Sequence, residues 1–243
     1  MKKLILLTLI IGSFLTTYAQ TEPAPQKKDW SKVSMGNRAG DHLMVQFGYD
    51  NWIQDPDTVR TKGFSRSLNV YFLLDFPFKS DPRWSVAFGV GVGTSNIFLD
   101  KMTAEVAGSG TKLVFRDVAD TNHFKKYKLV NAYAELPLEL RYTTNPENTS
   151  KGFKVAGGFK IGTMLSAHNK GKNLQNKGGN TINDYTVKES SKRFFNTTKV
   201  AASLRVGYGN FTVFGNYQIT NLLRDGAGPV IHPYSIGLTL SGL

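Results

Sequence analysis

Apolar and polar residues alternate along eight stretches of the chain. The clearest stretch is LNVYFLLDFPF, in which nearly every second residue is large and apolar. Residues two positions apart share a face of an extended strand. One face of this strand therefore carries Leu68, Val70, Phe72, Leu74, Phe76 and Phe78. The alternation predicts a β-strand with one side against an apolar environment.

The gaps between the eight predicted strands alternate between long and short. We expect strands at about 41–52, 65–78, 84–93, 129–142, 153–167, 198–208, 211–222 and 234–240. The segment 112–116 is expected to extend a strand above the membrane, and 169–195 is expected to be a long polar loop. Transmembrane barrels have short turns in the periplasm and long loops outside. The sequence therefore predicts an all-β fold, an eight-stranded antiparallel up-and-down transmembrane β-barrel with both mature termini in the periplasm.

Residues 1–19 have the features of a cleaved secretory signal peptide. Lys2 and Lys3 precede an apolar core, and Ala19 ends a small-residue cleavage site. A retained anchor is the weaker alternative, because the apolar core is shorter than the roughly 20 residues of a spanning helix. Residues 20–40, rich in Pro, Lys, Gln and Ser, are expected to form a periplasmic arm, and 41–243 the outer-membrane barrel.

The charge of the chain changes the expected partners. The formal net charge is +12 at pH 7, and it stays strongly positive without Lys2 and Lys3. A basic surface favours anionic partners, and for an exported barrel these are outer-membrane lipids and lipopolysaccharide. Export argues against nucleic acid as a partner. The chain has no cysteine, which excludes disulfides and a lipid-modified N-terminal cysteine.

Aromatic residues collect at one end of the predicted barrel. Transmembrane barrels place such girdles at the level of the lipid headgroups. A soluble β-sandwich, the alternative, would not require its aromatic residues to gather at strand ends. The predicted periplasmic girdle consists of Phe78, Trp84, Tyr142, Phe153, Tyr208 and Phe211.

The inward positions predict a polar lumen with charges of both signs. Eight strands enclose a space that side chains can fill or that holds one small ligand. Buried charges must be paired, so a closed polar network is expected rather than a diffusion pore. Counting back from the turn at 144–151 places Glu135 opposite Lys160 and Glu139 opposite Ala156, which predicts a Glu135–Lys160 cross-strand pair. The network comprises Asp75, Glu135, Glu139, Arg141, Lys154, Lys160 and Arg205.

No catalytic or metal-binding pattern stands out in the sequence. Glu135 and Glu139 could be paired catalytic carboxylates, but a structural role is the better-supported hypothesis, because lumen carboxylates with basic neighbours are usually structural. The four histidines lack metal-ligand spacing and are each expected to be solvated surface residues: His42, His123, His168 and His232. The glycines of Gly89–Gly93 face the lumen and are expected to make room for Tyr71 and Tyr133. We therefore expect no enzymatic activity, no metal and no cofactor.

Basic residues are dense in the long loops. The second loop contributes Lys125, Lys126 and Lys128. We hypothesise that the third loop binds lipopolysaccharide phosphates by Coulomb attraction and hydrogen bonding, with a merely solvated loop as the equal alternative. The third-loop candidates are Lys170, Lys172, Lys177, Lys188, Lys192 and Arg193.

The segment AYAELPLELRY, together with LDFPF, resembles the PorT-like outer-membrane β-barrel family of Bacteroidetes. The matching positions are Tyr133, Glu135, Leu136, Pro137, Leu138, Leu140, Arg141 and Tyr142. The resemblance implies a non-enzymatic structural or accessory subunit of an envelope assembly, with type IX secretion as the specific case. A surface barrel that binds lipopolysaccharide through basic loops is the alternative.

Overall fold

The computed structural model describes residues 42–53 and 59–242, which are built from strands and turns. The predicted signal peptide 1–19 and arm 20–40 lie outside the described residues. None of the described segments is a helix long and apolar enough to cross a membrane. The strands are β1 Leu43–Ile53, β2 Arg66–Pro77, β3 Trp84–Leu99, β4 Met102–Ala104, β5 Phe115–Asp117, β6 His123–Thr143, β7 Phe153–Gln175, β8 Thr181–Ser190, β9 Thr198–Tyr208, β10 Phe211–Gln218 and β11 His232–Ser241.

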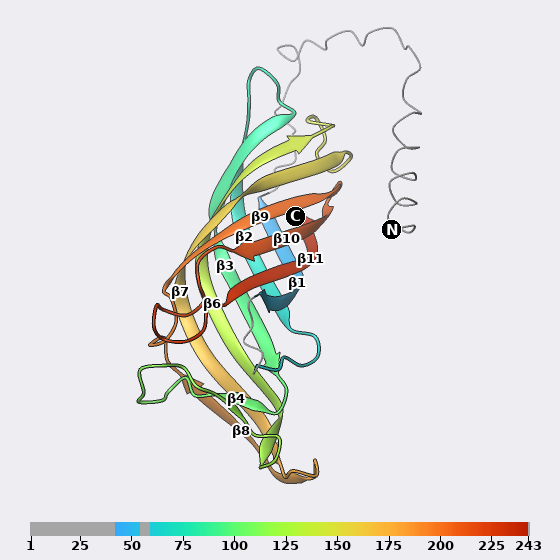
Figure 1. The fold of residues 1–243 in the computed structure, drawn as a ribbon. Helices are drawn as coiled ribbons and strands as arrows, with labels where there is room; N and C mark the ends of the chain where they lie inside the picture. Colours follow the sequence, from blue (N-terminus) through green and yellow to red (C-terminus); the bar gives the residue numbers. More distant parts are fainter. Residues whose placement is uncertain (1–41, 54–58, 243) are drawn as a thin grey trace, which may run out of the picture. The chain divides into compact units, whose positions relative to one another are not determined.

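Eight of these strands close into an antiparallel barrel (Figure 1). Each pairs with its barrel neighbours in the order β1, β2, β3, β6, β7, β9, β10 and β11, and β11 pairs back to β1. Closure leaves no barrel edge unpaired, which is the condition for crossing lipid with strands. The predicted eight-stranded antiparallel barrel is confirmed.

The barrel strands keep the predicted alternation of faces. On β2, Leu68 and Phe72 are exposed, whereas the intervening Asn69 and Tyr71 are buried in the lumen. On β6, Leu136 and Leu138 are exposed, whereas Glu135 and Glu139 are buried. Apolar side chains therefore face outward and polar side chains inward, the reverse of a soluble protein and the arrangement of a barrel in lipid.

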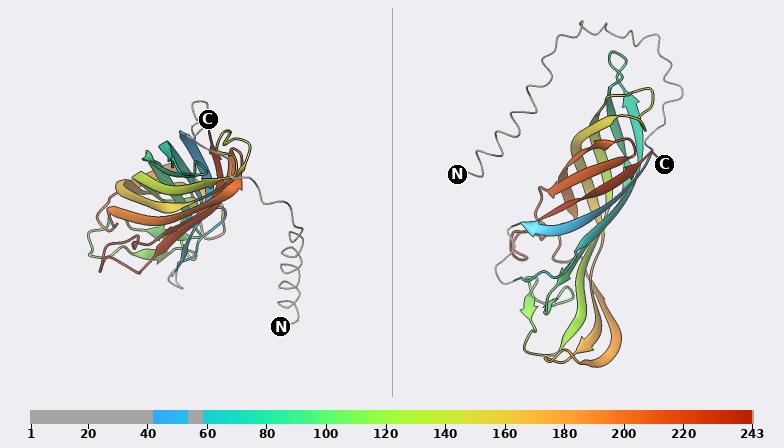
Figure 2. Two further views of the ribbon diagram at one scale, coloured as in Figure 1. Left: turned by 90° about the horizontal axis from the view of Figure 1, so that it is seen from above. Right: turned by 90° about the vertical axis from the view of Figure 1, so that its right-hand side faces the viewer.

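The two ends of the barrel differ in their connections. Short turns join β2 to β3, β6 to β7 and β9 to β10, and this end, which we call the short-turn end, also holds the start of β1 and the end of β11. The opposite, long-loop end carries β4, β5 and β8 (Figure 2). Strands β6 and β7, 21 and 23 residues long, continue into this end.

The long-loop end contains more strand than the sequence predicted. The segment 169–195, expected to be a loop, instead forms a hairpin in which β8 pairs with the far half of β7. The expected extension at 112–116 was wrong in its bounds, because the strand there is β5, paired only with the short β4. The β7–β8 hairpin continues the ladder of the barrel, whereas β4 and β5 form a separate two-stranded sheet. In both cases, pairing satisfies backbone groups that a polar loop would leave to water.

A β-bulge changes the facing of β7 at Leu165. Ala132 of β6 pairs with Ser166, but Tyr133 pairs with Met164, so Leu165 is an extra residue. One extra residue reverses the alternation beyond it. Before the bulge the outward positions are odd-numbered, as the exposed Ile161 shows. After it they are even-numbered, since Asn169 is buried and Lys170 is exposed.

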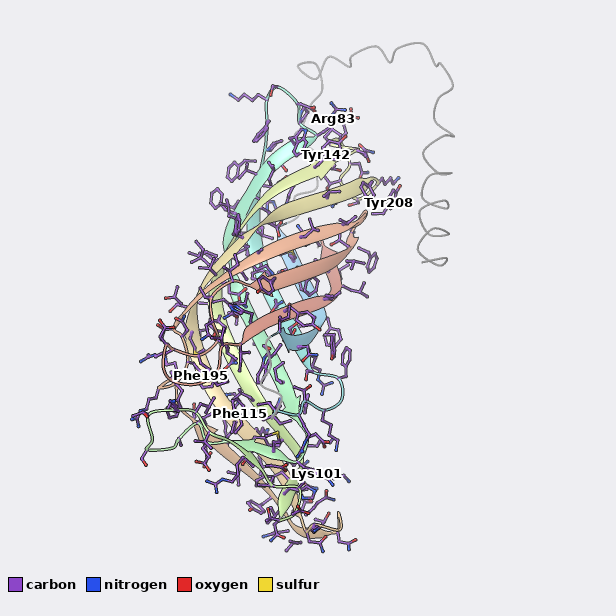
Figure 3. All side chains as sticks on the ribbon, in the orientation of Figure 1. Arg83, Lys101, Phe115, Tyr142, Phe195 and Tyr208 are labelled. Carbon is purple, nitrogen blue, oxygen red and sulfur yellow. The ribbon has the colours of Figure 1, made fainter. Side chains whose placement is uncertain are left out.

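The loops at the long-loop end fold over a hydrophobic core of their own. The core packs Met102, Ala104, Val106 and Leu113 with Phe194, Phe195, Leu222, Leu223 and Ile231 against the inward face of β6 and β7. Phe115 and Phe195 lie in this region in Figure 3. The predicted strand 211–222 was too long, because β10 ends at Gln218 and Leu222 turns into this core. We call this assembly the cap.

Hydrogen bonds tie the cap to the barrel strands. The Tyr127 hydroxyl of β6 accepts a bond from the Ala104 amide at 3.1 Å and donates to the Ala104 carbonyl at 3.0 Å. Burial raises the pKa of Tyr127 to about 12, so the phenol keeps its proton and remains a donor. Asn169 of β7 donates to the same carbonyl at 2.9 Å. The cap is therefore part of the folded structure rather than a set of separate loops.

Candidate functional site

An ion-pair cluster around Glu139 fills the lumen nearest the short-turn end. Arg205 of β9 contacts both Glu139 oxygens, with Nη2 2.6 Å from Oε2 and Nε 3.2 Å from Oε1. Arg141 donates from Nε to Glu139 Oε2 at 3.0 Å, and its Nη1 lies 3.6 Å from Asp75. The bidentate geometry suits the planar guanidinium. Lys154 lies nearby, buried with these groups around a small cavity.

A second polar layer surrounds Glu135 farther along the lumen. Lys199 of β9 contacts Glu135 Oε1 at 2.7 Å, and the Tyr71 hydroxyl donates to Oε2 at 2.5 Å. Lys160, almost fully buried, donates to Gln46 at 2.8 Å and to the Tyr71 oxygen at 3.2 Å. The lumen charges are therefore held in two hydrogen-bonded clusters, one around Glu139 and one around Glu135.

The expected direct pair between Glu135 and Lys160 was wrong. Glu135 lies opposite Gly162 and Glu139 opposite Gly158, so the register differs by two residues from the prediction. Both Glu135 and Lys160 face the lumen because a shift of two preserves the face. The cationic partner of Glu135 is Lys199, which was not predicted. Lys199 is an even number of residues from Arg205 on the same strand, so the alternation could have placed it in the lumen.

The glycines of β3 give space to this layer. A Cβ on Gly91 would overlap the Tyr71 ring, and one on Gly93 would lie 2.6 Å from Glu135 Oε1. The β3 glycines therefore make room for Tyr71, as expected. They also make room for Glu135, where Tyr133 was expected. The run contributes to packing and not to phosphate binding.

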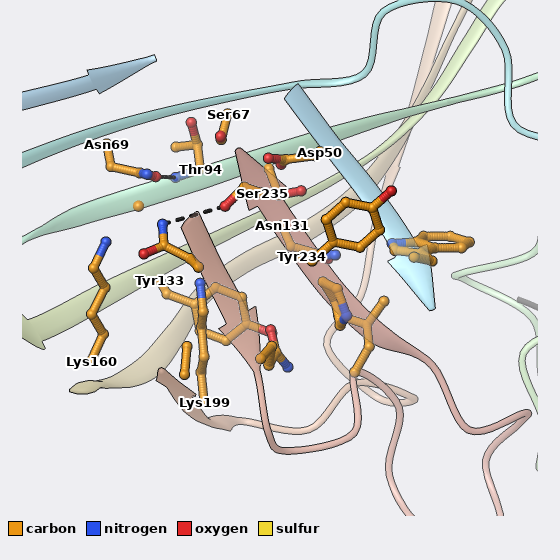
Figure 4. Close-up of a pocket in the computed structure, with 18 residues that line it drawn as sticks. Asp50, Ser67, Asn69, Thr94, Asn131, Tyr133, Lys160, Lys199, Tyr234 and Ser235 are labelled. Carbon is orange, nitrogen blue, oxygen red and sulfur yellow. Dashed lines mark hydrogen bonds between the residues drawn. The ribbon is translucent and has the colours of Figure 1, made fainter. Parts of the chain in front are cut away.

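A polar cavity with a volume of about 40 Å³ lies beside the second layer (Figure 4). Lys160, Lys199, Asn131 and Tyr133 are among the residues that line it, and Lys199 lies over the Tyr133 ring. Among the residues that the structure describes, the buried Asn131 Oδ1 and Tyr133 hydroxyl have no hydrogen-bond partner. A water molecule needs roughly 10–15 Å³ of such space, so the cavity suits a few waters rather than a diffusing solute.

The histidines lie apart from one another in the structure. His123 is buried at the start of β6, with Nδ1 3.1 Å from the Thr121 carbonyl, so its expected solvation was wrong. It is buried because the long-loop end folds around the start of β6 instead of leaving it as an open loop. Within the described ranges, no group of three or more His, Cys, Asp or Glu side chains could hold a metal ion.

Lysines from three neighbouring strands form a row on the outward face of the long-loop end. The strand registers place Lys128 of β6 opposite Lys170 of β7, and Lys170 opposite Lys188 of β8. One step farther from the barrel, Lys126 lies opposite Lys172. Directly paired residues share a face of the sheet. We call Lys126, Lys128, Lys170, Lys172 and Lys188 the basic row.

The other three candidates of the third loop lie outside this row. Lys177 is near the tip of the β7–β8 hairpin and pairs with Asp120 at 2.7 Å. Lys192 donates to the Met164 carbonyl at 3.4 Å, and Arg193 donates to the Ser109 carbonyl at 3.2 Å. The structure therefore brings together Lys170, Lys172 and Lys188 and assigns Lys192 and Arg193 to contacts with the protein backbone.

The basic row carries uncompensated positive charge. In the part of the chain that the structure describes, none of its five lysines has a carboxylate within ion-pair distance. Partial burial lowers the pKa of Lys128, and the positive charges of Lys170 and Arg66 lower it further. Burial and the neighbouring lysines also lower the pKa of His168. These shifts indicate a cluster of repelling cations that an anion would stabilise.

The basic row lies directly beyond the apolar outward band. From Lys128 toward the barrel, the outward positions of β6 are Val130, Ala132, Ala134 and then the exposed Leu136. On β2 the exposed Arg66 is followed two residues later by the exposed Leu68. Two residues of strand span about 7 Å. On β2 a cation therefore follows two residues beyond the exposed apolar face, and on β6 the apolar outward positions run up to Lys128.

The six predicted girdle residues lie together at the short-turn end. Trp84 pairs with Tyr142, with ring centroids 5.0 Å apart, and Tyr208 pairs with both Phe153 and Phe211. The Phe78 amide donates to the Trp84 carbonyl. Tyr142 and Tyr208 are both at this end in Figure 3. The six are Phe78, Trp84, Tyr142, Phe153, Tyr208 and Phe211.

Closed strands, an apolar exterior and a plugged polar lumen define a transmembrane β-barrel. The outer membrane protein beta-barrel domain family matches residues 18–222. The chain belongs to this family, and the family places the protein in the outer membrane.

The structural comparisons show distant likeness. One match is Ail, the attachment invasion locus protein of Yersinia pestis, with a TM-score of 0.36, 11% identity, and coverage of 82% of this chain and 96% of that chain. Ail in complex with the heparin analogue sucrose octasulfate matches with a TM-score of 0.32 and the same identity and coverage. No curated protein sequence matches this chain.

Proposed function

We propose that this protein is a non-enzymatic outer-membrane barrel that binds the phosphate groups of lipopolysaccharide in the outer leaflet through the basic row. The observation that carries the proposal is the position of the row: its unpaired lysines face outward immediately beyond the apolar band. An ammonium near an anionic lipid surface contributes about 1 kcal/mol. Several of them on one face favour a lipid with clustered phosphates.

The proposal includes an orientation for the barrel. Residues 1–19 are removed as a signal peptide, both mature termini lie in the periplasm, and the long-loop end faces outward. The difference between short turns and long loops supports this orientation. The basic row then meets the outer leaflet, whose lipopolysaccharide carries the phosphates.

The lumen supports a role without catalysis. Glu135 and Glu139 are each held by cations, with Lys199 on the first and Arg205 and Arg141 on the second. Carboxylates engaged in this way stabilise the wall rather than share a proton. The polar network of the lumen is thus assigned to structure.

The test neutralises two lysines of the basic row. In Lys170→Gln/Lys188→Gln, we expect the affinity for purified lipopolysaccharide to fall about thirty-fold at low ionic strength, because two contributions of about 1 kcal/mol are lost. Binding is measured by fluorescence titration of the refolded protein in a maltoside detergent, which lacks phosphate. The wild-type affinity should also fall as salt is added.

The matched control removes two lysines from the other end. Lys79 and Lys151 are exposed in the short turns, so Lys79→Gln/Lys151→Gln changes the net charge equally without touching the row. This variant should bind like the wild type. Equal losses in the two variants would show that only net charge matters and would contradict the proposal.

A second candidate is an accessory subunit of an envelope assembly, with type IX secretion as the specific case. Val114, Ile182 and Val230 are exposed at the long-loop end, beyond the apolar band, and offer a contact surface for a partner protein. The resemblance of segment 132–142 to the PorT-like family suggests the system. Its polar side chains Tyr133, Glu135 and Arg141 face the lumen, so the motif builds the wall and does not itself form the contact.

Purification from the native outer membrane in mild detergent tests this second role. We expect secretion or gliding subunits in near-equal amounts, identified by mass spectrometry, and their loss from Val114→Ser/Val230→Ser. A barrel that purifies with lipopolysaccharide alone would count against the accessory role.

A further inference from the structure

A groove lies beside the basic row, at the long-loop end of β2, β3 and β6. Its volume is about 440 Å³. Aromatic and cationic side chains line it, and the backbone of neighbouring residues completes it. The aromatic and cationic side chains in its lining are Lys62, Phe64, Arg66, Phe98, Lys125 and Lys126.

Phe98 is part of the lining of this groove and lies between two cations. The Arg66 guanidinium is 5.6 Å from the ring centroid, and Lys128 Nζ is 5.9 Å from it. Lys128 also donates to Asn96 at 2.7 Å, which fixes its direction. The aromatic ring therefore attracts one cation of the groove, Arg66, and one cation of the basic row, Lys128.

Phe64 extends the aromatic surface toward β1. Its side chain is 55% exposed, and its ring lies 5.5 Å from Tyr49 and 6.2 Å from Phe47. Lys62 at the rim is paired with Asp100 at 3.1 Å. Within the described residues, Arg66 and Lys126 have no carboxylate partner.

The combination of cations and aromatic rings suits a headgroup that carries both a phosphate and a sugar. A phosphate alone needs only the cations. The exposed ring of Phe64 and the half-buried ring of Phe98 add a surface for the C–H face of a sugar ring, which packs on the flat apolar face of an aromatic side chain. A groove of this volume is within the range that accommodates a small organic ligand.

We propose that the groove binds a phosphorylated sugar, the headgroup of lipopolysaccharide in the same leaflet, with the sugar against Phe98 and Phe64 and its phosphate on Arg66 and Lys126. The inference rests on the proposed function, which places the basic row at the phosphate level. The occupant is a membrane glycolipid because the groove adjoins the apolar band, two residues from the exposed Leu68. The two aromatic rings give the site selectivity for glycolipid over phospholipid.

The experiment compares two lipids that share phosphate but differ in sugar. Phe98→Ala should lower the affinity for lipopolysaccharide about tenfold and leave binding to phosphatidylglycerol vesicles unchanged. Lys170→Gln/Lys188→Gln should weaken binding to both lipids. Phe211→Ala, which removes an exposed ring at the short-turn end, should change neither.

The outcomes separate the two proposals. Equal affinity of Phe98→Ala and wild type for lipopolysaccharide, or equal losses for both lipids, would overturn the sugar site while leaving the basic row intact. If Lys170→Gln/Lys188→Gln binds both lipids with the affinity of the wild type, the proposed function is overturned. Folding is checked by the heat-dependent shift in gel mobility, and Phe98→Leu, which keeps the packing and loses the ring, serves if Phe98→Ala does not fold.

Discussion

Replacing Glu139 with glutamine is expected to lower the free energy of unfolding by about 3–5 kcal/mol. Glu139 is the shared acceptor of Arg205 and Arg141 in the barrel interior. The amide keeps the shape of the side chain but removes its charge. The Arg205 and Arg141 guanidinium groups then lose the Glu139 carboxylate, although Asp75 stays beside Arg141, and removing one member of a buried ion pair leaves the cost of burying the other.

Urea unfolding in lipid vesicles, followed by tryptophan fluorescence, measures this change. The control is Glu105→Gln, which breaks the exposed pair of Glu105 with Arg116 and should cost less than about 1 kcal/mol. Adding Arg205→Met to Glu139→Gln should recover part of the loss by removing a stranded charge. A Glu139→Gln barrel as stable as the Glu105→Gln control would refute the structural role assigned to this cluster.

Valine at Gly158 is expected to prevent or strongly impair barrel formation, with a cost of about 3 kcal/mol or more. A Cβ at this position would collide with the Leu138 carbonyl oxygen of the neighbouring β6. It would also lie 2.9 Å from the Glu139 Cα. These are backbone atoms, so relief requires β6 and β7 to separate rather than a side chain to rotate.

The heat-dependent shift in gel mobility after refolding measures the folded fraction of this variant. Gly215 on β10 provides the matched control, because a Cβ there would meet nothing within 4 Å. Gly215→Val should therefore fold like the wild type. If both valine variants fold equally well, close approach of β6 and β7 is not what requires glycine at 158.

The fold could be predicted because alternation is a local property of the chain. Each barrel strand has lipid on one side and a polar lumen on the other, so the hydrophobic pattern alone defines its two faces. The register, which decides the residues that lie opposite each other on neighbouring strands, depends instead on the turn that joins the strands. The turn after β6 places Glu139 opposite Gly158 instead of Ala156, and an error of two residues leaves every face correct while changing every partner.

The candidate site was predicted in its composition but not in its arrangement. Lys170 and Lys172 have the parity of lumen residues when counted from Phe153. The bulge at Leu165 moves them to the outward face, and nothing in the local hydrophobic pattern marks the inserted residue. Only the pairing of β7 with β6 and β8 reveals that Lys128, Lys170 and Lys188 are neighbours.

The cap could not be derived from alternation, because its residues come from separate loops. Phe194 and Phe195 pack with Leu222 and Leu223, which are far apart in the sequence. Adjacent pairs of large apolar residues within polar segments were the available signal. Such pairs indicate burial, but they do not say which other segment covers them.

The length of β6 and β7 lets the paired wall of the barrel reach well beyond its rim. At about 3.3 Å per residue, the 21 residues of β6 span roughly 70 Å, whereas the 11 residues of β1 span roughly 36 Å. The two strands stay paired to each other along most of this length, on both sides of the bulge at Leu165. A partner that contacts the β7–β8 hairpin therefore meets this molecule on strands that continue directly from the barrel wall.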